Sequence, residues 1–127
     1  MNNSSVLNRI KQINIENKIW IIYIGIILLS WYSNYLEKDY YLNKNIESKN
    51  SYRKILILIF TVLVIVYYYF LNSSLEDVKN LKISDSDNKK LLVYLSFIAS
   101  LLIFISGIIF LFIALSDDDL NVELAFN

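Results

Sequence analysis

The sequence predicts an all-α integral membrane protein, with three transmembrane helices in a small antiparallel bundle that forms a single membrane domain over residues 1–127. Hydrophobic residues make up 56% of the chain and the mean hydropathy is +0.45, whereas an average soluble domain is about 45–50% apolar. The apolar residues are concentrated in three windows, and the charged residues lie between or outside them. This distribution is typical of a chain that crosses a bilayer several times.

The first predicted span covers residues 19–36, which carry no charged side chain. As a helix this segment would be about 27 Å long, close to the thickness of the hydrocarbon layer. Trp20 lies near one end and Trp31, Tyr32 and Tyr35 near the other, as expected for amphipathic rings at the headgroups. A cleaved signal peptide is the alternative, but no small-x-small cleavage site follows the run, so an uncleaved anchor is favoured.

The other two spans are predicted over residues 55–71 and 91–115, which also lack charged side chains. The second has about the minimum length for crossing and ends in three consecutive tyrosines, Tyr67, Tyr68 and Tyr69. Its many β-branched residues are also typical of a buried strand, but the run is too long for one and contains no turn residues. The third is the longest uncharged run of the chain.

Small side chains lie along one face of the third predicted span. Ser100, Gly107 and Ala114 recur every seven positions, and Ser96 lies one turn before Ser100. A stripe of small residues lets another helix approach closely, although such residues are also simply tolerated in apolar helices. These four residues form the candidate helix-packing face, and Gly107→Leu is expected to weaken association far more than Leu111→Ala on another face.

The segments outside the spans are polar. Residues 1–18 either form an amphipathic helix at the membrane interface or a frayed terminus. Residues 37–54 and 72–90 are predicted to be polar loops. Ser74 and Asp77 in the second loop have the spacing of a capping box for a brief helix, and the sequence SDSDNKK predicts a turn and cap before the third span.

An acidic tail, residues 116–127, follows the third span. Asp117, Asp118 and Asp119 should terminate that span, because each charge costs about 2.5–3.5 kcal/mol at the centre of a membrane helix. The last residues, LNVELAFN, alternate apolar and polar side chains. This pattern is compatible with a strand added to a partner's sheet, with a short interfacial helix, or with a disordered end.

Orientation is predicted from the basic residues, which favour the cytoplasmic side in short loops. The N-terminus and the second loop share one side and contain Arg9, Lys11, Lys18, Lys79, Lys82, Lys89 and Lys90. The first loop and the tail share the other side and contain Lys38, Lys44, Lys49, Arg53 and Lys54. The third span decides between these similar sets, because lysines precede it and aspartates follow it. A cytoplasmic N-terminus and an extracytoplasmic C-terminus are therefore expected.

The composition argues against most chemistry. The chain has no cysteine or histidine, and every ionisable acid or base except tyrosine lies outside the predicted spans, so no catalytic residue, cofactor or metal is expected. The sequence around Asp85, Asp87 and Asn88 resembles the start of an EF-hand loop. It lacks the required glycine, however, and its twelfth position, Ser96, falls within a span. The formal net charge of zero gives no support for nucleic-acid binding.

We therefore expect a non-enzymatic membrane protein that acts through helix–helix contacts with itself or with a larger membrane protein, its remaining partner being the lipid bilayer. In number and size of spans only, the layout resembles bacteriocin immunity proteins, phage holins and accessory subunits of membrane complexes. A holin-like pore former and a toxin immunity protein are accordingly the alternatives. Frequent Ile, Asn, Lys and Tyr indicate an AT-rich bacterial genome and hence a bacterial cell membrane.

Overall fold

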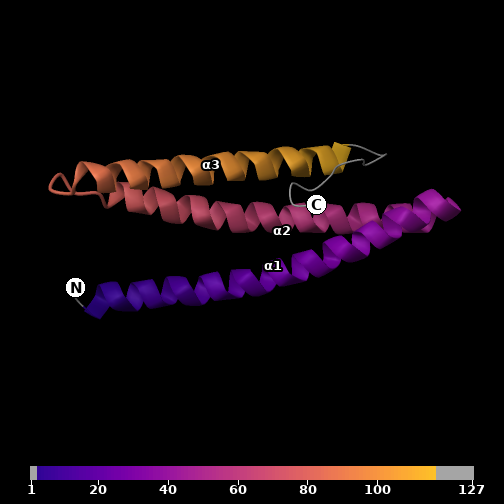
Figure 1. The fold of residues 1–127 in the computed structure, drawn as a ribbon, viewed down its shortest axis with the longest axis horizontal. Coiled ribbons are helices and arrows are strands. Elements are labelled where there is room, and N and C mark those ends of the chain that lie inside the picture. Colours follow the sequence, from indigo (N-terminus) through magenta and orange to yellow (C-terminus); the bar gives the residue numbers. More distant parts are fainter. Residues whose placement is uncertain (1–2, 117–127) are drawn as a thin grey trace. The chain divides into compact units, whose positions relative to one another are not determined.

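In a computed structural model of the protein, residues 3–116 are described, and they form three helices with no strand among them. Helix α1 covers Asn3–Asn43, α2 covers Ile46–Lys79 and α3 covers Asp87–Ser116 (Figure 1). Each helix contains a stretch that is long and apolar enough to cross a membrane. The prediction of an all-α membrane protein with three transmembrane helices is therefore confirmed.

The helices extend well beyond the apolar runs that predicted them. They contain 41, 34 and 30 residues, and at about 1.5 Å per residue all three exceed the hydrocarbon thickness of about 30 Å. The segments predicted as loops, 37–54 and 72–90, are mostly helical, so that part of the prediction was wrong. The physical reason is that an existing helix gains a hydrogen bond with each added residue, and the chain has no proline and only two glycines to stop it.

The N-terminal segment is also helical from Asn3, and it is continuous with the rest of α1. A frayed terminus is therefore excluded for the described part of this segment, whereas its position at the membrane interface stays a prediction. The structural alternatives for the tail concern residues 117–127, which lie outside the described residues.

The connection between α1 and α2 consists of Lys44 and Asn45 alone. Lys44 has a φ of 52°, a left-handed conformation that ends α1 and reverses the chain. The Asn45 side-chain oxygen accepts hydrogen bonds from the backbone N–H groups of Glu47 (3.1 Å) and Ser48 (3.4 Å). Asn45 is therefore the N-cap of α2, satisfying two amides that have no partner within the helix.

Asp39 fastens this connection from the last turn of α1. Its carboxylate accepts hydrogen bonds from the Ser48 hydroxyl (2.6 Å) and from the side-chain amides of Asn43 (2.7 Å) and Asn45 (3.1 Å). These donors, Ser48 foremost, hold the pKa of Asp39 below its usual value of 3.8. The stabilisation that they give is therefore present above pH 3.8 and is lost as the pH falls through the lowered pKa.

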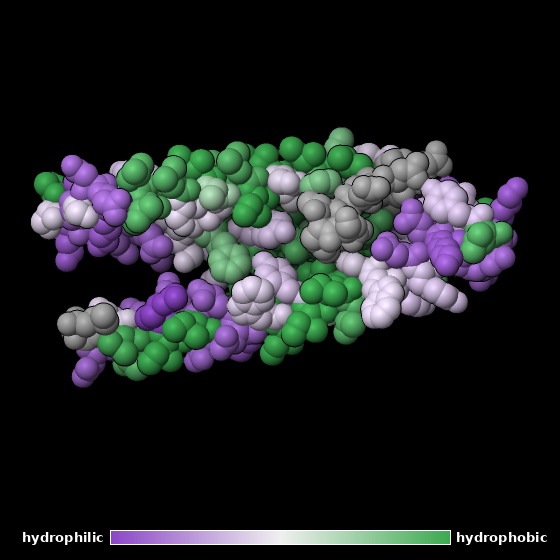
Figure 2. Space-filling view, in the orientation of Figure 1, coloured by the Kyte–Doolittle hydropathy of each residue, from purple (hydrophilic) through white to green (hydrophobic). Residues whose placement is uncertain are grey.

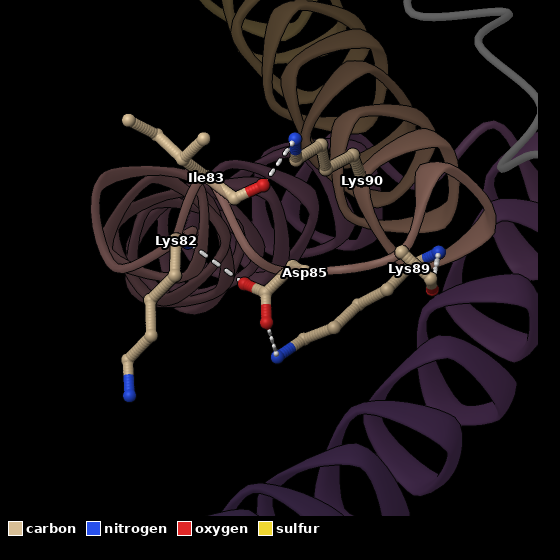
Figure 3. Close-up of polar contacts among 6 residues, drawn as sticks. Lys82, Ile83, Asp85, Lys89 and Lys90 are labelled. Atoms are coloured by element: carbon tan, nitrogen blue, oxygen red, sulfur yellow. Dashed lines mark hydrogen bonds and ion pairs between the residues drawn. The ribbon is translucent and has the colours of Figure 1, made fainter.

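Asp85 organises the connection between α2 and α3 (Figure 3). Its carboxylate accepts a hydrogen bond from the Lys82 backbone N–H (2.7 Å) and pairs with the Lys89 ammonium (3.2 Å), while its own N–H donates to the Lys82 carbonyl. The Lys82 hydrogen bond, followed by Lys89, lowers the pKa of Asp85. Ser86 caps α3 by accepting from the Lys89 N–H (3.1 Å). The predicted turn and cap before the third span therefore lie where the sequence placed them.

The chain divides within α2, between Ile55 and Leu56, into two compact units. The first contains α1 and the beginning of α2, and the second contains the rest of α2 together with α3. Within the second unit α2 and α3 run side by side and antiparallel (Figure 1). This hairpin contains the residues that the sequence proposed as a packing face.

Candidate functional site: the α2–α3 packing face

The register of α2 against α3 is fixed by pairs of residues along the hairpin. Near the α2–α3 turn, the Ser74 and Ser100 hydroxyls share a hydrogen bond of 2.8 Å. Further from the turn, the Phe60 and Phe110 rings stack with centroids 5.6 Å apart and planes 7° from parallel. Residue numbers fall along α2 as they rise along α3, which is the pairing of an antiparallel hairpin. The α2–α3 packing face is defined here as the surfaces that these pairs hold together.

Gly107 lies directly against α2, with no side chain of its own between the two helices. A Cβ atom at this position would be 2.9 Å from the Tyr67 ring and 3.4 Å from a methyl group of Val64. The first separation is shorter than van der Waals contact, so the absence of a side chain is what lets the Tyr67 ring lie against the backbone of α3. Tyr68, which follows Tyr67 on α2, contacts Phe104, which lies one turn before Gly107 on α3, with ring centroids 5.8 Å apart.

The four predicted packing residues do not all lie on this face. Ser100 contacts α2 through Ser74, and Gly107 is buried against it. Ala114 is also completely buried, whereas Ser96 is exposed. The structure therefore brings Ser100 and Gly107 together with α2 and leaves Ser96 out. Whether any of the four contacts another protein stays a prediction.

Two details of the sequence analysis need correction. Ser74 does not cap a helix, because it lies inside α2, where its hydroxyl donates to the Phe70 carbonyl (2.9 Å) and contacts Ser100. Leu111 is not on a separate face from Gly107, because it lies one turn further along α3 and is half-buried. Ser74 and Asp77 have the spacing of a capping box, but α2 runs without a break from Ile46 to Lys79, so no helix begins at Ser74.

Hydroxyl groups on α2 and α3 make hydrogen bonds within and between these helices. Thr61 donates to the Ile57 carbonyl (2.7 Å), as serine and threonine commonly do inside helices. The Ser74–Ser100 bond joins two helices; such bonds contribute on average about 0.6 kcal/mol in a membrane protein. Among residues 3–116, no group of three or more acidic, histidine or cysteine side chains could hold a metal ion.

No protein-family model matches the chain, and neither the curated proteins nor the solved structures contain a match to it. The packing face is therefore described from its own geometry. It joins two helices through small and aromatic side chains and contains no ionised group, so what it can do is hold α2 and α3 in one register.

Proposed function

We propose that this protein is a non-enzymatic membrane protein of a bacterial cell membrane and that it acts through helix–helix contacts with itself or with a larger membrane protein. The observation that supports this function is the separation of charge from the apolar runs: the ionisable groups other than tyrosine lie outside residues 19–36, 55–71 and 91–115. Proton relays and ion pathways normally need such groups at membrane depth. What remains available within the membrane is the surface of the helices.

The outer side of α3 is the surface best suited to these contacts. Hydrophobic residues cover it (Figure 2), and Leu102, Ile109 and Phe112 on it are exposed. Gly107 and Ser100, which would otherwise be attractive points for a partner helix, are already occupied by α2. A membrane partner would therefore pack against large aliphatic and aromatic side chains, by shape and van der Waals contact rather than through a small-residue stripe.

Photocrosslinking in native membranes tests this function. A benzoylphenylalanine residue placed at Leu102, Ile109 or Phe112 should give adducts of discrete mass, because a packed partner stays within reach of the probe whereas lipids exchange. Ile83, at the tip of the α2–α3 turn and 97% exposed, is the control position outside the apolar run. Crosslinks at none of the three α3 positions would contradict the proposal.

A measurement of leakage separates the proposal from the pore-forming alternative. Purified protein reconstituted into dye-loaded vesicles should leave the dye inside, because the apolar run of α3, residues 91–115, offers no charged lining. The same vesicles with a known pore-forming peptide provide the positive control. Leakage that rises with protein density would support a holin-like pore instead.

We further propose that the N-terminus and the α2–α3 turn face the cytoplasm. The lysines of the turn support this orientation: Lys89 and Lys90 directly precede the apolar run of α3, where basic residues have most influence. A reporter active only outside the cytoplasm should function when fused after Asn127 and fail when fused at Asn80. The reverse result would show that Arg53 and Lys54 determine the orientation, and equal results at both sites would contradict three crossings.

A further inference from the structure

The apolar runs of α2 and α3 end at different levels of the hairpin on the side of the α2–α3 turn. The Ser74–Ser100 bond and the Phe60–Phe110 stack set the register. From the serine pair toward the turn, α2 therefore runs beside the part of α3 that precedes Ser100. This part, residues 91–99, has no charged side chain, whereas the α2 segment beside it, residues 75–79, contains Glu76, Asp77 and Lys79. The first apolar turns of α3 thus lie next to the polar end of α2.

The two helices expose opposite chemistry at this level. On α3, Leu91, Leu95 and Ile98 are exposed, with no charge between them and the middle of the span. On α2, Glu76 and Asp77 are exposed. In Figure 2 the hydrophobic surface of α3 continues toward the turn, where hydrophilic residues gather. This end of the hairpin therefore has one apolar side and one side with charges of both signs, since Lys79 is exposed beside Glu76 and Asp77.

The lengths of the runs show why this matters for the position of the hairpin in the bilayer. The apolar run of α3 is about 37 Å long and that of α2 about 26 Å, against a hydrocarbon thickness of about 30 Å. Because the runs are offset, one membrane boundary cannot coincide with the end of both. Either the first turns of α3 leave the hydrocarbon, or the polar end of α2 is drawn to the membrane boundary beside them.

The charges before α3 favour the second arrangement. The Lys89 ammonium is held by Asp85 (3.2 Å), and the Lys90 ammonium donates to the Ile83 carbonyl (3.2 Å), so both are tied to the turn (Figure 3). The charged boundary of the α3 run thus coincides with the turn itself. Glu76 and Asp77 are exposed on α2, and their charges are costly in hydrocarbon, so they favour a place at the headgroups.

We propose that α3 sets the depth of the hairpin in the bilayer. Lipid acyl chains cover the exposed face of its first apolar turns, Leu91–Ile98, while the polar end of α2 lies at headgroup depth on the other side of the hairpin. Acyl chains are the occupant because this face continues the exposed surface of the span without an intervening charge. On the α3 side the membrane boundary then lies near Leu91, whereas on the α2 side it lies near Leu71, where the apolar run of α2 ends. This inference concerns the first turns of α3, whereas the proposed partner contacts lie further along the same side, at Leu102, Ile109 and Phe112.

Single-cysteine variants test this depth in the bilayer, since the chain has no cysteine of its own. The variants Leu95→Cys on α3 and Asp77→Cys on α2 are compared with Ile83→Cys in the turn and Ile109→Cys within the span. Each full-length protein is reconstituted into vesicles of phosphatidylcholine and phosphatidylglycerol and exposed on both sides, by freeze–thaw loading, to a water-soluble maleimide. Labelling in sodium dodecyl sulfate gives each variant its own maximal rate.

The Leu95→Cys variant should react roughly tenfold or more slowly than Ile83→Cys, and as slowly as Ile109→Cys, because a thiol in hydrocarbon does not ionise. Asp77→Cys should react clearly faster than Leu95→Cys, although the two lie near the same level of the hairpin. Rapid labelling of Leu95→Cys would overturn the proposal, as would protection of Asp77→Cys equal to that of Ile109→Cys. Protection of Leu95→Cys that disappears when the protein is diluted with lipid would assign this face to a second copy and would also overturn it.

Discussion

Replacing Gly107 with leucine is expected to push α2 away from α3 and to lower the free energy of unfolding by about 1–3 kcal/mol, the usual cost of overpacking. A Cβ atom alone would already be 2.9 Å from the Tyr67 ring, and a leucine adds three further carbon atoms. Titration with sodium dodecyl sulfate in mixed micelles, followed by circular dichroism or by energy transfer between the helices, measures the change.

Gly25→Leu is the matched control for this variant. Gly25 lies within the apolar part of α1, and within its own unit a Cβ built there meets no atom within 4 Å apart from its chain neighbours and the backbone of its own helix. Both substitutions replace a helical glycine with the same good helix former, so their effects on helix propensity are shared. A loss of stability in Gly107→Leu that Gly25→Leu equals would contradict the packing account. Adding Tyr67→Ala should restore part of the loss, because it removes the ring that the leucine would meet.

Replacing Phe60 with alanine is expected to destabilise the hairpin by about 1–2 kcal/mol, since it removes a buried ring and its contacts with Phe110. Phe60 is 3% exposed and stacks with Phe110. In a water-soluble core the same change costs about 3–5 kcal/mol. The expected value is smaller here because lipid is as apolar as the protein interior, which leaves packing as the main loss.

Leu58→Ala provides the control within the same helix, because Leu58 is 51% exposed and should have lipid on its open side. The same detergent titration should show a much smaller change for this variant. In a Phe110→Ala background, Phe60→Ala should cost less than in the unchanged protein, because the stack is already lost. Additive effects of the two phenylalanine substitutions would show that the stack contributes nothing of its own.

The fold class was predictable because it depends on hydropathy and charge, which are properties of the sequence alone. An uncharged run such as residues 91–115 cannot leave its backbone unbonded in lipid, so it must form a helix. The cap at Ser86 was also predictable from local sequence, because serine is a preferred residue at a helix N-terminus. Helix length was not, since the polar residues that flank a span are as compatible with a continued helix as with a loop.

The packing face could be predicted only in part. Small residues mark places where helices can approach, and Gly107 and Ser100 do contact α2. The aromatic partners Phe60 and Tyr67 carried no such signal, because nearly every position of an apolar run is apolar whichever way it faces. Ser74 was misleading, since its spacing from Asp77 fits a cap but its hydroxyl bonds across to α3.

By itself, then, the sequence determined that the chain crosses a membrane three times as helices and that its ionisable acids and bases other than tyrosine lie outside the apolar runs. Only the tertiary structure decided that α2 occupies the small-residue face of α3 and that the apolar runs of the two helices are offset. The physical reason is that hydropathy records how a segment partitions between water and lipid. Which side chains meet across a hairpin, and in what register, depends instead on shape and on hydrogen bonds between residues far apart in the chain.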